Sequence, residues 1–247
     1  MNDKIFRIGG SGIEAADERV KALMNNLVNA ETPGFKASDV TVRAFPVELE
    51  AAQTRLQGQL GMEPVTESVF YNYSPGALIR TGSPTDLAIG GDGFFVIQGS
   101  WGEGYTRDGR FTLDKEGRLI SVTGSFPLLG QKGPITVDPG AKIEISGTGV
   151  VRVNDQVVDQ VRIARIENPD CLESVNNSVF RAKGEVSNIS DIGSPRVIQG
   201  YVESSNVSMI DEMTKLVMLS RLYQINTKII TSRDAMLTRA MEMGKTQ

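Results

Sequence analysis

The sequence predicts an α+β protein in which paired N- and C-terminal helices, coiled-coil-like in their packing, flank a mostly antiparallel β central domain. Apolar side chains recur at helical spacing near both ends of the chain, over residues 13–30 and 207–243. Between them lies a Gly-rich stretch of short alternating runs, which is typical of antiparallel strands. Because a long helix needs cover for its apolar face, the two terminal helices are expected to pack on each other, on another copy of the chain, or on both.

The N-terminal helix is predicted from a heptad-like seam. Its apolar residues, spaced alternately by three and four positions, are Ile13, Ala16, Val20, Leu23 and Leu27. Ser11 can cap the helix, and Glu14 three positions later completes a capping box. Pro33 ends the helix because the residue before a proline is pushed out of the α region, and Gly34 permits a sharp change of direction.

The C-terminal helix is predicted to be unusually long. Ser204, Ser205 and Asn206 supply caps for a run that contains no Pro or Gly before Gly244. Its apolar residues form two stripes, one of Met209, Met213, Leu216 and Tyr223 and the other of Leu222, Ile225, Ile229, Met236, Ala240 and Met243. Two stripes favour more than one packed neighbour, although a simple helical hairpin inside a monomer stays open as the alternative.

Short strand-like runs fill the middle of the chain. They cover residues 87–97, 104–113, 119–122, 143–145, 150–153, 157–158 and 161–166, and turn pairs such as Asp108-Gly109 and Asn154-Asp155 separate them. Their close spacing favours an antiparallel sandwich or a small barrel. We therefore expect a helical domain of residues 1–36 plus 204–247, a linker or arm of residues 37–74 with a helix near residues 48–57, and a β-rich central domain of residues 75–203.

The composition argues against several classes of function. The chain of 247 residues has no His, which excludes Ser-His-Asp triads and His-containing metal sites, and the single Cys171 excludes an intramolecular disulfide. The formal net charge of −4 is spread along the chain, unlike the basic surface of a nucleic-acid binder. No run approaches the roughly 18 apolar residues that span a bilayer, and residues 1–7 lack an apolar leader. The chain is therefore expected not to be membrane-inserted and, if it leaves the cytoplasm, to be exported without a cleavable signal peptide.

The carboxylates that an acid/base enzyme would need are Asp86, Asp92, Asp108 and Asp114. The last three lie in or near Gly-containing turns, where Asp is common for backbone reasons. The segment Gly90-Gly91-Asp92-Gly93 lacks the spacing and the following helix of a phosphate loop. We expect no catalytic, cofactor-binding or metal-binding residues, no cofactor and no small-molecule substrate.

One segment is far more specific than any heptad, namely Asn25-Asn26-Leu27-Val28-Asn29-Ala30-Glu31-Thr32-Pro33-Gly34-Phe35-Lys36. Asn side chains near a helix end can bond backbone groups, Thr-Pro-Gly then forces an extended exit, and Phe35 follows as an apolar anchor. The segment resembles the N-terminal signature of the bacterial flagellar rod and hook proteins, the axial family of the basal body. The resemblance continues in order at residues 90–97, 105–111, 200–207, 211–213 and 220–226. Val28 departs from it, because the family usually has Ala there.

The resemblance implies a non-enzymatic structural subunit of the periplasmic rod of the flagellar basal body, polymerising through its terminal helices into the axial drive shaft. Its implied partners are other flagellar rod proteins, copies of itself and the flagellar export apparatus, with no nucleic acid. The residues expected at the assembly interface are Ile13, Val20, Leu23, Asn26, Leu27, Asn29, Thr32, Pro33, Gly34, Phe35, Asn206, Met213, Leu216, Arg221, Tyr223 and Ile229.

The position along the rod is less sharply indicated. Residues 43–47, 81–87 and 133–137 resemble the proximal rod protein, whereas residues 201–203 and 223–226 resemble the distal one. Hook proteins are generally much longer, so a rod protein is favoured, and the proximal position is preferred over the distal. Two interpretations from other classes stay open: an exported β-rich cell-wall hydrolase, and a coiled-coil adaptor for one soluble partner.

Overall fold

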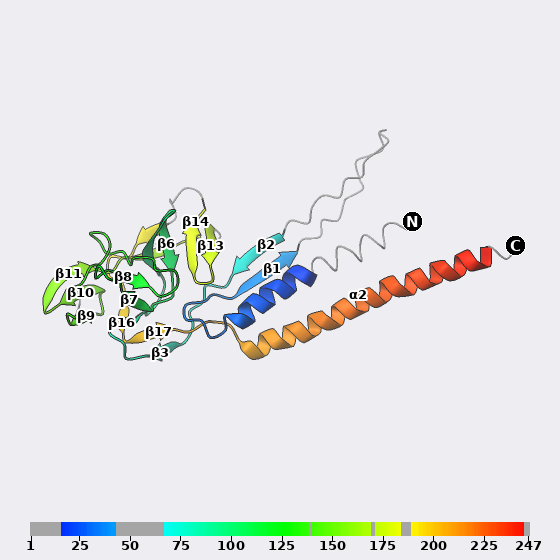
Figure 1. The fold of residues 1–247 in the computed structure, drawn as a ribbon, viewed down its shortest axis with the longest axis horizontal. Helices are drawn as coiled ribbons and strands as arrows, with labels where there is room; N and C mark the ends of the chain where they lie inside the picture. Colours follow the sequence, from blue (N-terminus) through cyan, green and yellow to red (C-terminus); the bar gives the residue numbers. More distant parts are fainter. Residues whose placement is uncertain (1–15, 43–66, 139, 169–170, 184–188, 245–247) are drawn as a thin grey trace, which may run out of the picture. The chain divides into compact units, whose positions relative to one another are not determined.

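The computed structural model describes residues 16–42, 67–138, 140–168, 171–183 and 189–244 (Figure 1). The chain divides into two compact units. We call the unit of residues 26–37 and 71–209 the β body, and the unit of residues 1–25, 38–70 and 210–247 the terminal unit. The domain boundaries expected from the sequence stay a prediction.

The β body is built from short strands whose pairings are antiparallel. They are β3 (Leu78–Arg80), β4 (Leu87–Ile89), β5 (Phe94–Gly99), β6 (Gly102–Thr106), β7 (Phe111–Leu113), β8 (Leu119–Ser121), β9 (Ile143–Ile145), β10 (Val150–Val153), β11 (Gln156–Gln160), β12 (Ile163–Ile166), β13 (Leu172–Asn176), β14 (Val179–Ala182), β15 (Ile189–Asp191), β16 (Val197–Gln199) and β17 (Tyr201–Glu203). The largest sheet has the order β13-β14-β6-β5-β12-β15, beside a three-stranded sheet β11-β10-β9 and the pairs β16-β4, β17-β3 and β7-β8.

Strand β5 lies at the centre of the body because both of its faces are covered. Phe95 and Ile97 belong to the larger apolar cluster, which includes residues of β4, β7, β8, β10 and β12. Phe94 and Val96, which point to the opposite face, pack in a second cluster with Tyr105 and Phe180. Burial of each such side chain stabilises the fold by about 1.5–3 kcal/mol, so the continuous apolar run of β5 holds two layers together.

The last two strands of the body return the chain to its beginning. Strand β16 pairs with β4 through Val197 and Ile89, and β17 pairs with β3 through Val202 and Ile79. Segments more than a hundred positions apart, such as Thr81 and Gly200, therefore share hydrogen bonds. This return brings the C-terminal end of the body to the segment that follows the N-terminal helix.

The terminal unit contains a helix over residues 16–28, the paired strands β1 (Ser38–Val42) and β2 (Glu67–Tyr71), and α2 (Met209–Gly244). Helix α2 runs for 36 residues and carries Asp211 and Glu212 in its first turn, where the positive end of the helix dipole favours carboxylates. The prediction of one long C-terminal helix up to Gly244 matches this element. Neither helix in the described ranges has the length and apolar character that a membrane crossing requires.

The fold class expected from the sequence is wrong in its helical part. The described residues contain only the helix at 16–28 and α2, and most of the structure is β-sheet around the central antiparallel sheet, without paired terminal helices that flank it. Apolar side chains that were expected in a helical seam are exposed instead, with Met213 at 48%, Leu222 at 53% and Tyr223 at 49%. Helical periodicity predicts that a face will be covered, but it does not say by which segment.

Smaller differences concern the strands. The run at residues 87–97 is broken into β4 and β5, because Gly91 and Gly93 between them adopt positive φ angles of 142° and 119°. Residues 37–74, expected as a linker or arm, hold strands β1 and β2. The helix expected near residues 48–57 lies outside the described residues.

Candidate functional site

The Asn-rich segment leaves the N-terminal helix through consecutive turns. The amide of Thr32 donates to the carbonyl of Asn29 (3.0 Å), and the amide of Phe35 donates to that of Thr32 (3.2 Å). The side chain of Asn177 donates to Oδ1 of Asn29 (2.9 Å), which fixes the turn to the β13–β14 hairpin. Phe35 is 2% exposed and acts as the expected apolar anchor.

The backbone at Gly34 lies close to the backbone of Glu203 and of Asp108. Its φ angle is +70°, and its amide donates to the carbonyl of Glu203 (2.8 Å). A Cβ atom at this position would lie 2.1 Å from the backbone nitrogen of Asp108. Glycine is therefore needed here twice, once for its backbone conformation and once for space.

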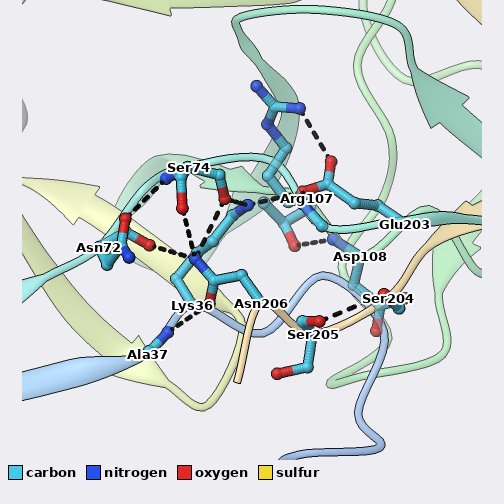
Figure 2. Close-up of polar contacts among 12 residues, drawn as sticks. Lys36, Ala37, Asn72, Ser74, Arg107, Asp108, Glu203, Ser204, Ser205 and Asn206 are labelled. Carbon is cyan, nitrogen blue, oxygen red and sulfur yellow. Dashed lines mark hydrogen bonds and ion pairs between the residues drawn. The ribbon is translucent and has the colours of Figure 1, made fainter. Parts of the chain in front are cut away.

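Lys36, the last residue of this motif, completes a buried charge cluster that joins three distant segments (Figure 2). Nζ of Lys36 donates to Oε1 of Glu203 (2.6 Å), and Nη1 of Arg107 donates to Oε2 of the same carboxylate (2.9 Å). The side chains of Lys36, Arg107 and Glu203 are 0%, 4% and 1% exposed. One carboxylate thus pairs with two buried cations.

Backbone carbonyls accept one further hydrogen bond from each cation. Lys36 donates to the carbonyl of Ser74 (2.7 Å), and Nη2 of Arg107 donates to that of Gly91 (2.8 Å). The Arg107 guanidinium also lies 5.3 Å from the ring centroid of Phe94. Burial lowers the pKa of Lys36, and the neighbouring Arg107 adds to this, while Glu203 opposes it. The cluster therefore depends on Glu203 more than on either cation.

Asn206 extends this cluster, and we call the group of Lys36, Arg107, Glu203 and Asn206 the junction. Its Oδ1 accepts from the amide of Ala37 (2.8 Å), and its Nδ2 donates to the carbonyls of Asn72 (2.7 Å) and Ser74 (3.0 Å). Figure 2 shows this amide group facing the backbone of two other segments. Asn206 uses its donor and acceptor together, which an Asp or a Leu could not do.

The predicted interface residues fall into two sets. Asn26, Asn29, Gly34 and Phe35 are buried in the β body, where Thr32, Pro33, Leu27 and Asn206 are partly buried. In the terminal unit Val20, Leu23 and Leu216 are partly buried, and Met213, Arg221 and Tyr223 are exposed. Ile13 lies outside the described residues, and Ile229 belongs to α2. Within the first set, Gly34 bonds the backbone of Glu203 and Asn206 bonds that of Ala37. Assembly contacts of either set stay a prediction.

Three central residues of the junction were not assigned a role from the sequence, namely Lys36, Arg107 and Glu203. Each lay inside a segment that carried the family resemblance, yet charged side chains are by default expected at the surface. Their pairing connects positions 167 apart in the chain for Lys36 and Glu203. No local pattern in the sequence marks any of the three for burial.

Carboxylates weighed as acid/base groups are engaged in local structure. Both oxygens of Asp108 accept hydrogen bonds from Arg110, and Oδ2 also accepts from Thr123. Asp114 accepts from the amides of Glu116 and Arg118 and from the Arg118 side chain, so it closes a turn. Across the described ranges no group of three or more His, Cys, Asp and Glu side chains is placed to hold a metal ion.

The terminal unit has a groove of about 350 Å³ lined by residues of the first helix, β1 and α2. Its apolar walls come from Leu23, Val40, Met218, Leu219 and Leu222. Leu219 is 9% exposed and Glu212 is 5% exposed, so this side of α2 has partial cover within its own unit.

The β body is closed by segments from both ends of the chain and is followed by a long helix, and both parts match families of flagellar hook and rod proteins. Residues 88–153 match the family described as flagellar hook protein FlgE/F/G D1 domain, and residues 198–243 match the flagellar basal body rod FlgEFG protein C-terminal family. The chain belongs to the flagellar basal-body rod protein family. The resemblance found in its motifs is thereby confirmed.

Individual relatives extend over nearly the whole chain. The flagellar basal-body rod protein FlgF of Caulobacter vibrioides is 30% identical over 98% of this chain and 99% of its own length. FlgG of Buchnera aphidicola is 31% identical over 96% of this chain and 98% of its own, and FlgF of Salmonella typhimurium is 30% identical over 98% of both. Relatives with both names match to a similar degree, so identity alone does not assign a position within the rod.

Proposed function

We propose that this chain is a structural, non-enzymatic subunit of the flagellar basal-body rod, which polymerises through contacts of α2 with neighbouring subunits. Membership of the rod protein family supports the location in the basal body. The engagement of Asp108 and Asp114 in turns supports a structural role for the β body.

The observation that carries the proposal is the apolar surface of α2 on the side away from its own unit. At 100° per residue, Ile210 and Val217 lie on the opposite side of the helix from the buried Leu219. Ile210 is 78% exposed and Val217 is 53% exposed. A helix that is apolar on opposite sides is normally covered on both, so the second side calls for another chain.

The kind of interface decides what assembly results. We propose a head-to-tail contact for the apolar side of α2, because a head-to-tail contact that does not close a ring generates a filament. Methionines such as Met213 and Met218 lie among the exposed side chains. Their flexible side chains suit contacts that differ slightly from one neighbour to the next.

The proposal is tested by placing a charge on this side of α2 in a strain whose own copy is deleted. Val217→Asp should abolish swimming and leave the chain out of isolated basal bodies, since a carboxylate would be buried in the contact. Thr227→Asp, at an exposed polar position about 80° around the helix from Val217, is the matched control and should swim normally. Equal motility of the two variants would rule out assembly through this side.

Within the rod we propose the proximal position, with other rod proteins, copies of the same chain and the flagellar export apparatus as partners. The segments at residues 81–87 and 133–137, which resemble the proximal member, support this. No insertion separates β7 and β8 from residues 133–137, and the amide of Leu119 donates to the carbonyl of Ile135. Capture of ordered rod intermediates tests the position: a distal subunit would be missing from the earliest ones.

A further inference from the structure

The chain passes between the β body and the terminal unit at four places, after residues 25, 37, 70 and 209. An asparagine or a residue bonded to one lies close to each place: Asn29, Ala37, Asn72 and Asn206. We propose that Glu203 and Asn206 form a clasp that holds the segments at residues 34–37, 72–76 and 203–206 together. The clasp opens and closes as one unit, independently of the central sheet.

Asn206 joins the segments through the backbone. It accepts from the amide of Ala37 and donates to the carbonyl of Asn72, while the amide of Asn72 donates to the carbonyl of Ala37 (2.8 Å). These three hydrogen bonds form a closed ring through three segments. Loss of the Asn206 side chain would therefore weaken the contact between residues 37 and 72 as well as its own.

Glu203 joins the same segments through charge. Its carboxylate accepts from Lys36 and from the amide of Gly76 (2.9 Å), and its carbonyl accepts from the amide of Gly34. The amide of Ser204 donates to the carbonyl of Ala77 (2.8 Å). Asn206 and Glu203 thus both bond the segments at residues 34–37 and 72–76, which is the arrangement expected for a unit that opens cooperatively.

Mainly polar contacts hold the clasp, with Phe35 buried and Tyr73 packed edge-on against Phe94 of β5 (ring centroids 5.8 Å apart), whereas apolar burial holds the sheet. Strand β3, which follows the 72–76 segment, is exposed along its whole length, with Leu78 at 40% and Ile79 at 52%. Strand β5 is held by apolar side chains with almost no exposure. Regions held by polar contacts and little apolar burial open at lower free energy than the core. Phe35 is the buried apolar side chain of the segment at residues 34–37.

Amide hydrogen exchange on the purified full-length chain tests this. The probes are the amides of Gly34, Ala37, Asn72 and Gly76, whose hydrogen bonds all lie in the clasp. Glu203→Gln and Asn206→Ala are compared with Glu173→Gln, a matched change at an exposed ion pair with Arg181. Asn206→Ala removes no charge, so it serves if Glu203→Gln fails to fold.

In the unaltered chain we expect the four probes to share one opening free energy, below that of β5 and β6. Each clasp variant should speed exchange at all four probes by at least ten-fold, and the Glu173→Gln control should leave it unchanged. Unchanged exchange at the probes would overturn the proposal. So would a change confined to the amides that contact the replaced side chain, because the clasp would not act as one unit. Probes that are as strongly protected as β5 in the unaltered chain would show that the clasp is part of the core. Assembly plays no part in this measurement, so its outcome is independent of the rod contact.

Discussion

Nζ of Lys36 lies 2.6 Å from Oε1 of Glu203, across 167 positions of the chain and with both side chains almost fully buried. Arg107 occupies the other oxygen of the same carboxylate. Removal of the single Glu203 carboxylate lowers stability far more than removal of one of the two cations, because it leaves buried positive charge uncompensated. The three residues therefore contribute unequally to the stability of the junction.

The first prediction follows from this inequality. Glu203→Gln should lower the free energy of unfolding by about 3–5 kcal/mol, since Lys36 and Arg107 lose their counter-ion. Lys36→Met should lower it by less than about 2 kcal/mol, because the Arg107 pair remains and Asn206 still donates to the carbonyl of Ser74. Urea unfolding of the full-length variants measures both. Equal losses would mean that the cluster is not governed by its single carboxylate.

The second prediction concerns Gly34. Gly34→Ala should destabilise the β body by about 3 kcal/mol or more, because positive φ and the clash with Asp108 act together. Gly82→Ala is the control: its φ of +77° is similar, but no atom lies within 4 Å of the added Cβ. That variant should lose only about 1 kcal/mol. Thermal unfolding of the two proteins separates backbone strain from lack of space, and similar losses would remove the close approach as a cause.

A third prediction concerns alkaline pH. Burial, with a smaller effect of Glu103, raises the pKa of Tyr105 from 10.0 to about 12. The folded chain therefore holds a proton that the unfolded chain releases, so this contribution is present below pH 10 and is lost as the pH rises through 12. The slope from this group is at most about 1.4 kcal/mol per pH unit. Tyr105→Phe should flatten the fall in stability between pH 10 and 12; an unchanged slope would contradict the assignment.

Much of the fold could be predicted from local patterns. Helix α2 followed from helical spacing and the absence of Gly and Pro, and β9 and β10 lie where alternating apolar residues indicated strands. The run at residues 104–113 was expected as one strand but is divided between β6 and β7. In the gap between them, Arg107 binds Glu203 and Asp108 binds Arg110. Such a break depends on a residue about a hundred positions away and leaves no mark on local periodicity.

The junction could be predicted only in part for the same reason. Gly34, Phe35 and Asn206 were found because they belong to short motifs with a readable backbone role. Lys36 and Glu203 carry no such local mark, since each looks like an ordinary surface charge until the return of β17 to β3 brings them together. Pairing of the terminal helices was expected from spacing alone, and spacing does not identify the partner.

The central claim, that α2 contacts neighbouring rod subunits through its exposed apolar side, is tested most directly by cross-linking in place. A photoreactive amino acid is introduced at Val217, and basal bodies are isolated after illumination. The account predicts a covalent adduct between this chain and another rod subunit, absent from the purified monomer at low concentration. Recovery of the chain in basal bodies with position 217 linked to no other subunit would contradict it.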